Sequence, residues 1–388
     1  MLRYLIPIYD PEVKKWSLEA RLLRWLTFLW LILGLIALFS ASYALSDSQN
    51  NDGLYFIKRQ LIWVWFGLIG LNLIVQCPLK NMLKIAPWMI LGVLSLIIST
   101  HIPILGEEVN GATRWIKIGP ISIQPSELMK PFLVLQSAHL FGNWYRLRWG
   151  YRLGWLGVFA LTLAAILLQP NLSTTALCGM TIWLIALAAG LPLTYLSGSA
   201  IGGFALAFIS ISLREYQKRR VLSFLNPWAD ARGDGYQLVQ SLLAVGSGGT
   251  WGNGYGLSQQ KLFYLPFPDT DFIFAVFAEE FGFAGGVVLL FLLMLYATLA
   301  LLVALKCRHP IKRLVAMGVM IVLVGQSLLN IGVATGALPT TGLPLPLFSY
   351  GGSSSLASLF LAGLLIRVAR ESSEADVVPL ATRRQNNV

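Results

Sequence analysis

Long apolar runs separated by short polar links recur along the whole chain. Each run approaches the roughly 20 apolar residues that cross a hydrocarbon core of about 30 Å, so we predict a bundle of membrane-spanning helices. No separate soluble domain is needed to accommodate the polar links. The ten predicted spans cover residues 22–45, 60–77, 83–99, 126–141, 153–168, 174–189, 193–213, 272–305, 314–335 and 354–367.

This pattern predicts an all-α polytopic membrane protein, with a single domain over residues 1–370. The polar residues 371–388 are expected to form a disordered cytoplasmic tail. The eighth span is long for one straight crossing and contains three glycines, so we expect a tilt, a kink or an interfacial half in it. External loops are predicted at residues 100–125, at residues 336–353 and, as the largest loop, between the seventh and eighth spans at residues 214–271.

Composition excludes a soluble protein. Hydrophobic residues make up 56% of the 388 residues, charged residues make up 12%, and the mean hydropathy is +0.67. The formal net charge of +11 resides mainly in the short links between spans, which indicates membrane topology and anionic lipid rather than nucleic acid. The alternation of cationic links places both termini in the cytoplasm. Three cysteines and three histidines show no spacing typical of a disulfide or a zinc site.

The largest external loop is an exception to the charge pattern because it carries cations on the outer side. Its cluster of Lys218, Arg219 and Arg220 is a candidate platform for a lipid diphosphate, whose charge it would stabilise. The alternative is a solvated amphipathic segment, since long loops partly escape the charge rule.

Two carboxylates lie where this loop enters the eighth span. In the stretch KLFYLPFPDTDFIFAVFAEEFGFAGG, Asp271 stands beside the apolar helix and is the candidate for taking a proton from a substrate hydroxyl. The alternative is helix capping, because aspartate at a helix start accepts hydrogen bonds from free backbone N–H groups. The sequence alone favours neither.

Several polar side chains lie at membrane depth. Glu127 and Lys130 are three residues apart at the start of the fourth span, which places them on one helix face as a possible ion pair lining a cavity. Trp115 is a candidate interfacial anchor or a stacking surface for a sugar ring. Further polar residues within spans are Glu279, Glu280, Gln326 and Asn330, the last two explained equally well by helix–helix hydrogen bonds.

Four segments resemble the SEDS (shape, elongation, division and sporulation) family, which includes FtsW, RodA and SpoVE. The resemblance covers nearly the whole chain, and the approach QKLFYLP and the run SLLAVGSGG are most similar to the FtsW branch. The segments are NGATRWIKIGPISIQPSELMK, FLNPWADARGDGYQLVQSLLAVGSGGTWGNGYG, QKLFYLPFPDTDFIFAVFAEEFGFAGG and NIGVATGALPTTGLPLPLFSYGGSSSL.

The resemblance implies a peptidoglycan glycosyltransferase that polymerises lipid II on the outer face of the cytoplasmic membrane and releases undecaprenyl diphosphate. It implies Asp271 as the base, with substrate-binding roles for the loop cations and for Arg114, Trp115, Glu127 and Lys130. A single displacement with one base would invert the anomeric centre. It also implies a class B penicillin-binding transpeptidase as a partner, other divisome proteins as contacts, and a place at the division septum.

The chain departs from the family pattern at two sites. The segment from Pro266 to Asp271 replaces Pro-Glu-Ala-His-Thr-Asp, which removes a glutamate and a histidine, adds the carboxylate of Asp269 and keeps Asp271. Asn171 replaces an aspartate. Asp269 and Asp271 have the spacing of an Asp-x-Asp metal motif, so a divalent cation, Mg²⁺ or Mn²⁺, is a candidate cofactor, although coincidence explains the motif as well. Two other functions stay open: a lipid II flippase, for which ten spans and buried polar pairs are also suitable, and a RodA-type polymerase of the side wall.

Overall fold

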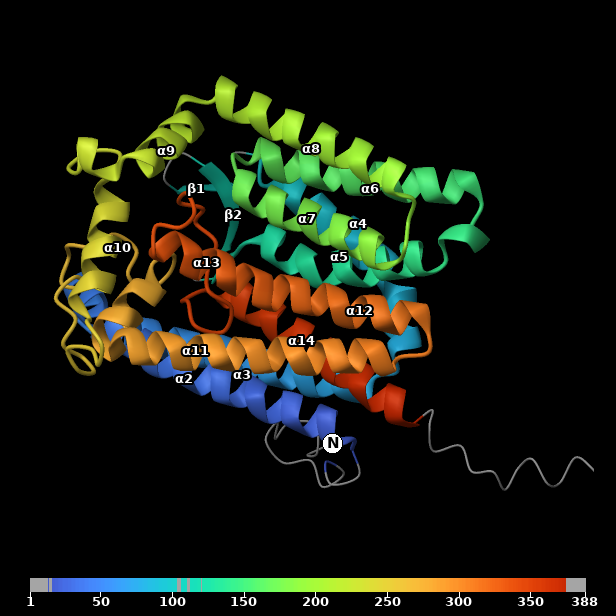
Figure 1. The fold of residues 1–388 in the computed structure, drawn as a ribbon, viewed down its shortest axis with the longest axis horizontal. Helices are drawn as coiled ribbons and strands as arrows, with labels where there is room; N and C mark the ends of the chain where they lie inside the picture. The colour runs from blue at the N-terminus through green and yellow to red at the C-terminus, as the bar shows by residue number, and fades with distance from the viewer. Residues whose placement is uncertain (1–12, 14–15, 103–105, 110–111, 120, 375–388) are drawn as a thin grey trace, which may run out of the picture.

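The computed structural model describes residues 13, 16–102, 106–109, 112–119 and 121–374. Every predicted span corresponds to helix in this structure, and the ninth is built from three consecutive pieces (Figure 1). Of these helical stretches, eight have the length and hydropathy of a membrane crossing. The other two are α7 (Leu172–Ala188), with 17 residues, and α5 (Pro125–Gly142). The spans are α2 (Leu18–Asn50), α3 (Tyr55–Gln76), α4 (Leu79–Ser99), α5 (Pro125–Gly142), α6 (Trp149–Leu168), α7 (Leu172–Ala188), α8 (Leu193–Leu213), α11 (Ile273–Lys306), the ninth span as α12 (Pro310–Met320), the π-helical η4 (Ile321–Gly325) and α13 (Gln326–Ala334), and α14 (Gly352–Glu374).

Burial separates central helices from peripheral ones. In α14, the stretch from Leu361 to Ala369 is almost entirely buried, because this helix packs against α2, α3, α5 and α12. In contrast, α8 lies at the edge of the bundle, and most of its apolar side chains are exposed, as expected of a helix facing lipid (Figure 1).

The predicted loop 100–125 contains an antiparallel sheet that the all-α prediction missed. Its strands are β1 (Gly106–Val109), β2 (Ala112–Ile118) and β3 (Ile121–Ile123), in the order β1-β2-β3. Ile116 pairs with Gly106 on one side and with Ile123 on the other, and its side chain is buried. The strands are short, and their apolar residues are too few for the sequence to distinguish them from loop.

The largest loop also contains helices: α9 (Glu215–Leu225), the 3₁₀ turn η3 (Pro227–Asp230) and α10 (Tyr236–Ser247). These helices lie at the same end of the bundle as the sheet, and α11 starts there (Figure 1). We call this the sheet end. Residues 371–374, predicted as tail, belong to α14; the rest of that prediction, residues 375–388, lies outside the described residues, as do Arg3, Lys14 and Lys15 of the cationic N-terminal segment.

The eighth span has the predicted kink. Gly282 interrupts α11 with φ 65° and ψ −166°, a conformation that is essentially restricted to glycine. A Cβ atom there would lie 2.3 Å from the backbone nitrogen of Gly252, so the loop backbone approaches the helix too closely for any side chain.

Candidate active site

Asp271 lies at the sheet end, two residues before α11 begins. The N-cap position of α11 is Phe272, and no side chain caps the helix, so the capping alternative for Asp271 is wrong. The residue is partly buried, and its carboxylate accepts no hydrogen bond from any described residue. Its oxygens are therefore available to a substrate group, as a general base requires.

Two other segments, α13 and the loop before α14, hold the backbone around this carboxylate. Asn330 donates from Nδ2 to the carbonyl of Asp271, at 2.8 Å, and Ser349 donates from Oγ to that of Thr270, at 2.6 Å. The backbone N–H of Tyr350 donates to the carbonyl of Asp269 at 2.8 Å. Three consecutive carbonyls are thus each satisfied by a different residue, and the loop carrying Asp271 is fixed in place.

The positive charges of two arginines affect the pKa of the Asp271 carboxyl. Burial raises the pKa of Asp271, while the positive charges of Arg220, on α9, and Arg114, on β2, lower it. The guanidinium of Arg114 donates to the carbonyls of Gln169 (3.1 Å) and Pro170, and its own pKa is lowered chiefly by burial. Arg114 precedes Arg220 by 106 residues and Arg220 precedes Asp271 by 51, so only the fold brings these three charges together.

Of the three predicted cations on α9, one faces this cluster. Arg220 donates to the carbonyl of Thr340 at 3.3 Å, and its guanidinium lies 4.6 Å from the ring centroid of Tyr216, one helical turn away. Lys218 and Arg219 are exposed on other faces of the helix. Arg219 forms a solvent-exposed ion pair with Asp234 at 4.0 Å.

The structure confirms the predicted pairing of Glu127 with Lys130. Their side chains are buried, and Lys130 Nζ lies 2.6 Å from Glu127 Oε1. Lys130 also donates to Gln326 Oε1 at 2.9 Å, and Gln326 donates from Nε2 to the carbonyl of Pro344 at 2.7 Å. Asn330 donates a second hydrogen bond to the carbonyl of Leu343 at 2.8 Å. Gln326 therefore makes the helix–helix hydrogen bond that the sequence suggested, to Lys130 of α5, and both Gln326 and Asn330 also hold loop carbonyls.

The remaining predicted residues have the following environments. Trp115 is partly exposed on β2, adjacent to Arg114, and both of its predicted uses stay open. Asp269 is buried, which raises the pKa of its carboxyl to about 6, with a further contribution from Asp271. Within the described part of the chain, no three His, Cys, Asp or Glu side chains are grouped closely enough to hold a metal ion, so a cation here would have two carboxylates and ligands from the substrate.

Asn171 shows why the turn after α6 tolerates an amide in place of a carboxylate. Its side-chain oxygen accepts a hydrogen bond from the backbone N–H of Thr174 at 3.2 Å and caps α7. Asparagine and aspartate cap helices about equally well, so the helix start needs no negative charge.

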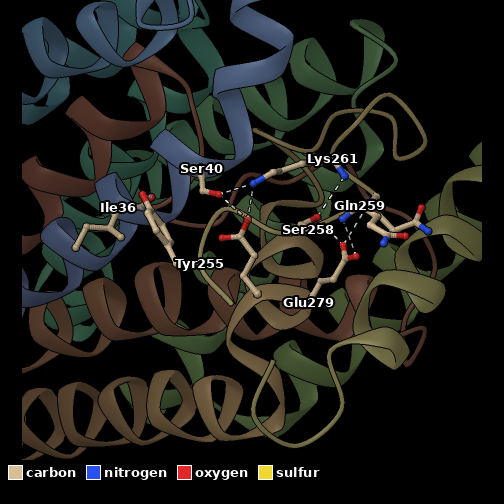
Figure 2. A network of polar contacts seen from close by, with 9 residues as sticks. Ile36, Ser40, Tyr255, Ser258, Gln259, Lys261 and Glu279 are labelled. Atoms are coloured by element: carbon tan, nitrogen blue, oxygen red, sulfur yellow. Dashed lines mark hydrogen bonds and ion pairs between the residues drawn. The ribbon is translucent and has the colours of Figure 1, made fainter. Parts of the chain in front are cut away.

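Sequence reasoning missed a second polar cluster at the start of α11. Glu280 forms a buried ion pair with Lys261 at 2.6 Å, and Glu279 accepts hydrogen bonds from Ser258 and from two backbone N–H groups (Figure 2). Both acids are evident in the sequence, but Lys261 lies in the largest external loop, where a lysine is expected to be solvated. One sequence feature could have indicated this ion pair: Lys261 begins an apolar stretch and lies 19 residues before Glu280, an acid within a predicted span.

Comparisons with known proteins identify the family of this chain. A family profile described as "Cell cycle protein", covering FtsW, RodA and SpoVE, matches residues 20–374. A protein of Synechocystis sp., named as a probable peptidoglycan glycosyltransferase FtsW, is 63% identical over 99% of this chain and 97% of its own length. The chain belongs to the FtsW/RodA/SpoVE family. Within the family, the 63% identity to this relative supports the FtsW branch. Stage V sporulation protein E of Bacillus subtilis is less similar, with 36% identity over 89% of this chain and 96% of its own length.

Solved structures of the FtsW/RodA/SpoVE family have the same fold. Thermus thermophilus RodA, the rod shape determining protein, superposes with a TM-score of 0.66 and 30% identity, covering 90% of this chain and 96% of that one. A chain from a structure described as a peptidoglycan synthase complex that coordinates polymerization and crosslinking gives a TM-score of 0.72 at 32% identity, covering 90% of this chain and 97% of that one. The fold is that of a polytopic helical membrane protein of this family.

Proposed function

We propose that this chain is a peptidoglycan glycosyltransferase of the FtsW branch, which polymerises lipid II into glycan strands. Its curated relatives carry that activity in their names. The observation that carries the proposal is the state of the Asp271 carboxylate at the sheet end. It has no hydrogen-bond partner among the described residues, and the positive charges of Arg114 and Arg220 lower its pKa.

In the proposed reaction, Asp271 takes the proton from the sugar 4-hydroxyl of the acceptor lipid II. That oxygen forms a bond to the anomeric carbon of the growing strand, whose bond to undecaprenyl diphosphate breaks, and the bonding electrons leave with the diphosphate. The anomeric centre is inverted because a single displacement takes place. Arg114 and Arg220 stabilise the negative charge that develops on the leaving diphosphate. Cations held in place in a partly buried site interact strongly with such a charge.

A divalent cation at Asp269 and Asp271 is part of this proposal. Mg²⁺ is commonly held by one or two carboxylates together with substrate phosphates, and a bound cation would neutralise charge on the leaving diphosphate. If a cation binds there, EDTA abolishes polymerisation, Mg²⁺ or Mn²⁺ restores it, and the Asp269→Asn variant needs a higher cation concentration. Equal rates with and without EDTA would remove the cation from the mechanism.

The proposed location is the cytoplasmic membrane at the division septum, with the sheet end on the outer side. A class B penicillin-binding transpeptidase is the proposed partner, because a similar fold occurs in a complex that couples polymerization to crosslinking. Other divisome proteins are further proposed contacts. The side-wall role of a RodA-type polymerase is the alternative within the same chemistry.

The function is tested with fluorescent lipid II and purified chain, alone and with its cognate transpeptidase. We expect glycan ladders on a gel from substrate supplied on the outer side. A flippase would instead move labelled lipid II between the leaflets of a vesicle without lengthening it. Transport without ladders, in a preparation where an added polymerase consumes the same substrate, would refute the proposal.

A further inference from the structure

The break at Gly282 separates the first two turns of α11 from the rest of the helix. A break in a membrane helix frees backbone groups that must find other partners. Here the loop 248–254 supplies them, so that loop and helix segment form one hydrogen-bonded unit. The bonds run from Asn253 N to Glu279 O (3.0 Å), Gly254 N to Glu280 O (3.1 Å), Phe283 N to Gly249 O (2.9 Å) and Ala284 N to Thr250 O (3.0 Å).

The same helix segment holds the next part of the loop through two buried acids. Glu279 accepts from Ser258 Oγ at 2.5 Å and from the backbone N–H groups of Gln259 (2.9 Å) and Gln260 (3.3 Å). Glu280 Oε1 accepts from Lys261 Nζ at 2.6 Å. Figure 2 shows Ser258 and Lys261 of the loop, Glu279 of α11 and Ser40 of α2 converging on this region.

Ser40 extends the cluster to a third element. Its Oγ donates to Glu280 at 2.5 Å and accepts from Lys261 Nζ at 2.7 Å, so α2 is tied to both partners of the ion pair (Figure 2). Lys261, Glu280 and Ser40 are all buried. We call these three residues the lock.

The segment between the lock and Asp271 is strained. Phe263 and Phe267 have φ values of 67° and 56°, and both side chains are exposed. Such conformations cost on the order of 1–3 kcal/mol each for residues other than glycine, so surrounding contacts must maintain them. The carbonyls of residues 269–271 are held at one end of the segment, and the lock holds the other end.

We infer that Lys261, Glu280 and Ser40 are positioning residues for the glycosyl transfer: the lock fixes residues 262–271 so that Asp271 stays where it can take the proton. This inference rests on the proposed function. A buried ion pair often contributes no more stability than an apolar pair of similar volume, so its contribution here is fixed geometry. A displacement of about 1 Å in a catalytic group is enough to reduce a rate strongly.

The test compares one unpaired variant with one apolar pair. Lys261→Met leaves Glu280 buried without its cation and is expected to lower both the unfolding temperature and kcat. The double variant Lys261→Met/Glu280→Leu is expected to recover the wild-type unfolding temperature. Its kcat for lipid II polymerisation stays at least tenfold below wild type, with KM changed less than twofold. Thr298→Val is the control, because Thr298 is exposed on the later part of α11 and bonds only to its own helix.

Hydrogen–deuterium exchange provides a readout that does not depend on activity. We expect the amides of residues 262–271 to exchange at least fivefold faster in the double variant than in wild type, and at the wild-type rate in Thr298→Val. Wild-type kcat and exchange in a stable double variant would overturn the inference. If the wild type makes no glycan, the proposed function fails, while the exchange rates still decide whether the lock holds the segment.

Discussion

At the scale of single residues, the Asp271 carboxyl is subject to two opposing effects. Burial raises its pKa, because the charged form loses hydration, and the cations of Arg220 and Arg114 lower it. A general base acts in its ionised form, so polymerisation is expected to fall as the pH drops through the pKa of Asp271. The low-pH limit of activity therefore reports the balance between burial and the two arginines.

Removing Arg220 should shift that limit. Arg220→Gln removes the positive charge that lowers the pKa of Asp271 most, so the pKa rises and the low-pH half-maximum of kcat/KM moves to higher pH. Arg219→Gln is the matched control on the same helix, because Arg219 is exposed and pairs with Asp234. An unshifted limit in Arg220→Gln, or an equal shift in both variants, would contradict the assignment.

The contacts predicted from the sequence are local, within one helical turn, and the contacts that it missed join distant segments. Glu127 and Lys130 are one helical turn apart, so helix geometry alone predicted their ion pair. Lys261 and Glu280 are separated by a loop that folds back on a broken helix, and no local period predicts their contact. For Arg220, sequence identified the cluster but could not say which of three cations faces Asp271.

At the scale of elements, eight of the ten spans were predictable from apolar length alone, whereas α5 and α7 fall short of that criterion. The kink in α11 was indicated by its glycines, although the sequence does not show that Gly282 rather than Gly285 or Gly286 makes the break. The sheet was missed because short strands in a polar loop carry no strong period. Helix capping of α11 by Asp271 was a local expectation, and the tertiary contacts of the loop replaced it.

The kink can be tested with two neighbouring glycines. Gly282→Ala forces a side chain into φ 65° and places its Cβ 2.3 Å from Gly252 N, so we expect a loss of unfolding free energy on the order of 2–3 kcal/mol. Gly286→Ala is the control, since the nearest atom to its added Cβ, in Phe274, is 3.9 Å away. Thermal unfolding in detergent measures both. Equal stability of the two variants would show that the break at Gly282 is not required.

At the scale of the whole molecule, the account requires the sheet end to face outward. The charge pattern predicts this orientation, and the two ends of the bundle can be labelled separately. Trp251 is 82% exposed in the loop at the sheet end, and Tyr145 is 72% exposed in the link between α5 and α6 at the opposite end.

Cysteine labelling in intact cells tests the orientation. In a background with Cys77, Cys178 and Cys307 replaced by serine, Trp251→Cys is expected to react with a membrane-impermeant maleimide, while Tyr145→Cys reacts only after permeabilisation. Each variant serves as the control for the other. The reverse pattern would place Asp271 in the cytoplasm, away from the proposed outer-face substrate.

The central claim is that Asp271 is the base of a lipid II polymerase, and one gel tests it most directly. Wild type and Asp271→Asn are compared for glycan ladders from fluorescent lipid II, after thermal unfolding shows that the variant is folded. The account predicts ladders from wild type and a rate at least 100-fold lower from Asp271→Asn, because the amide keeps the shape but cannot take the proton. Ladders of wild-type length and amount from the folded variant would contradict it.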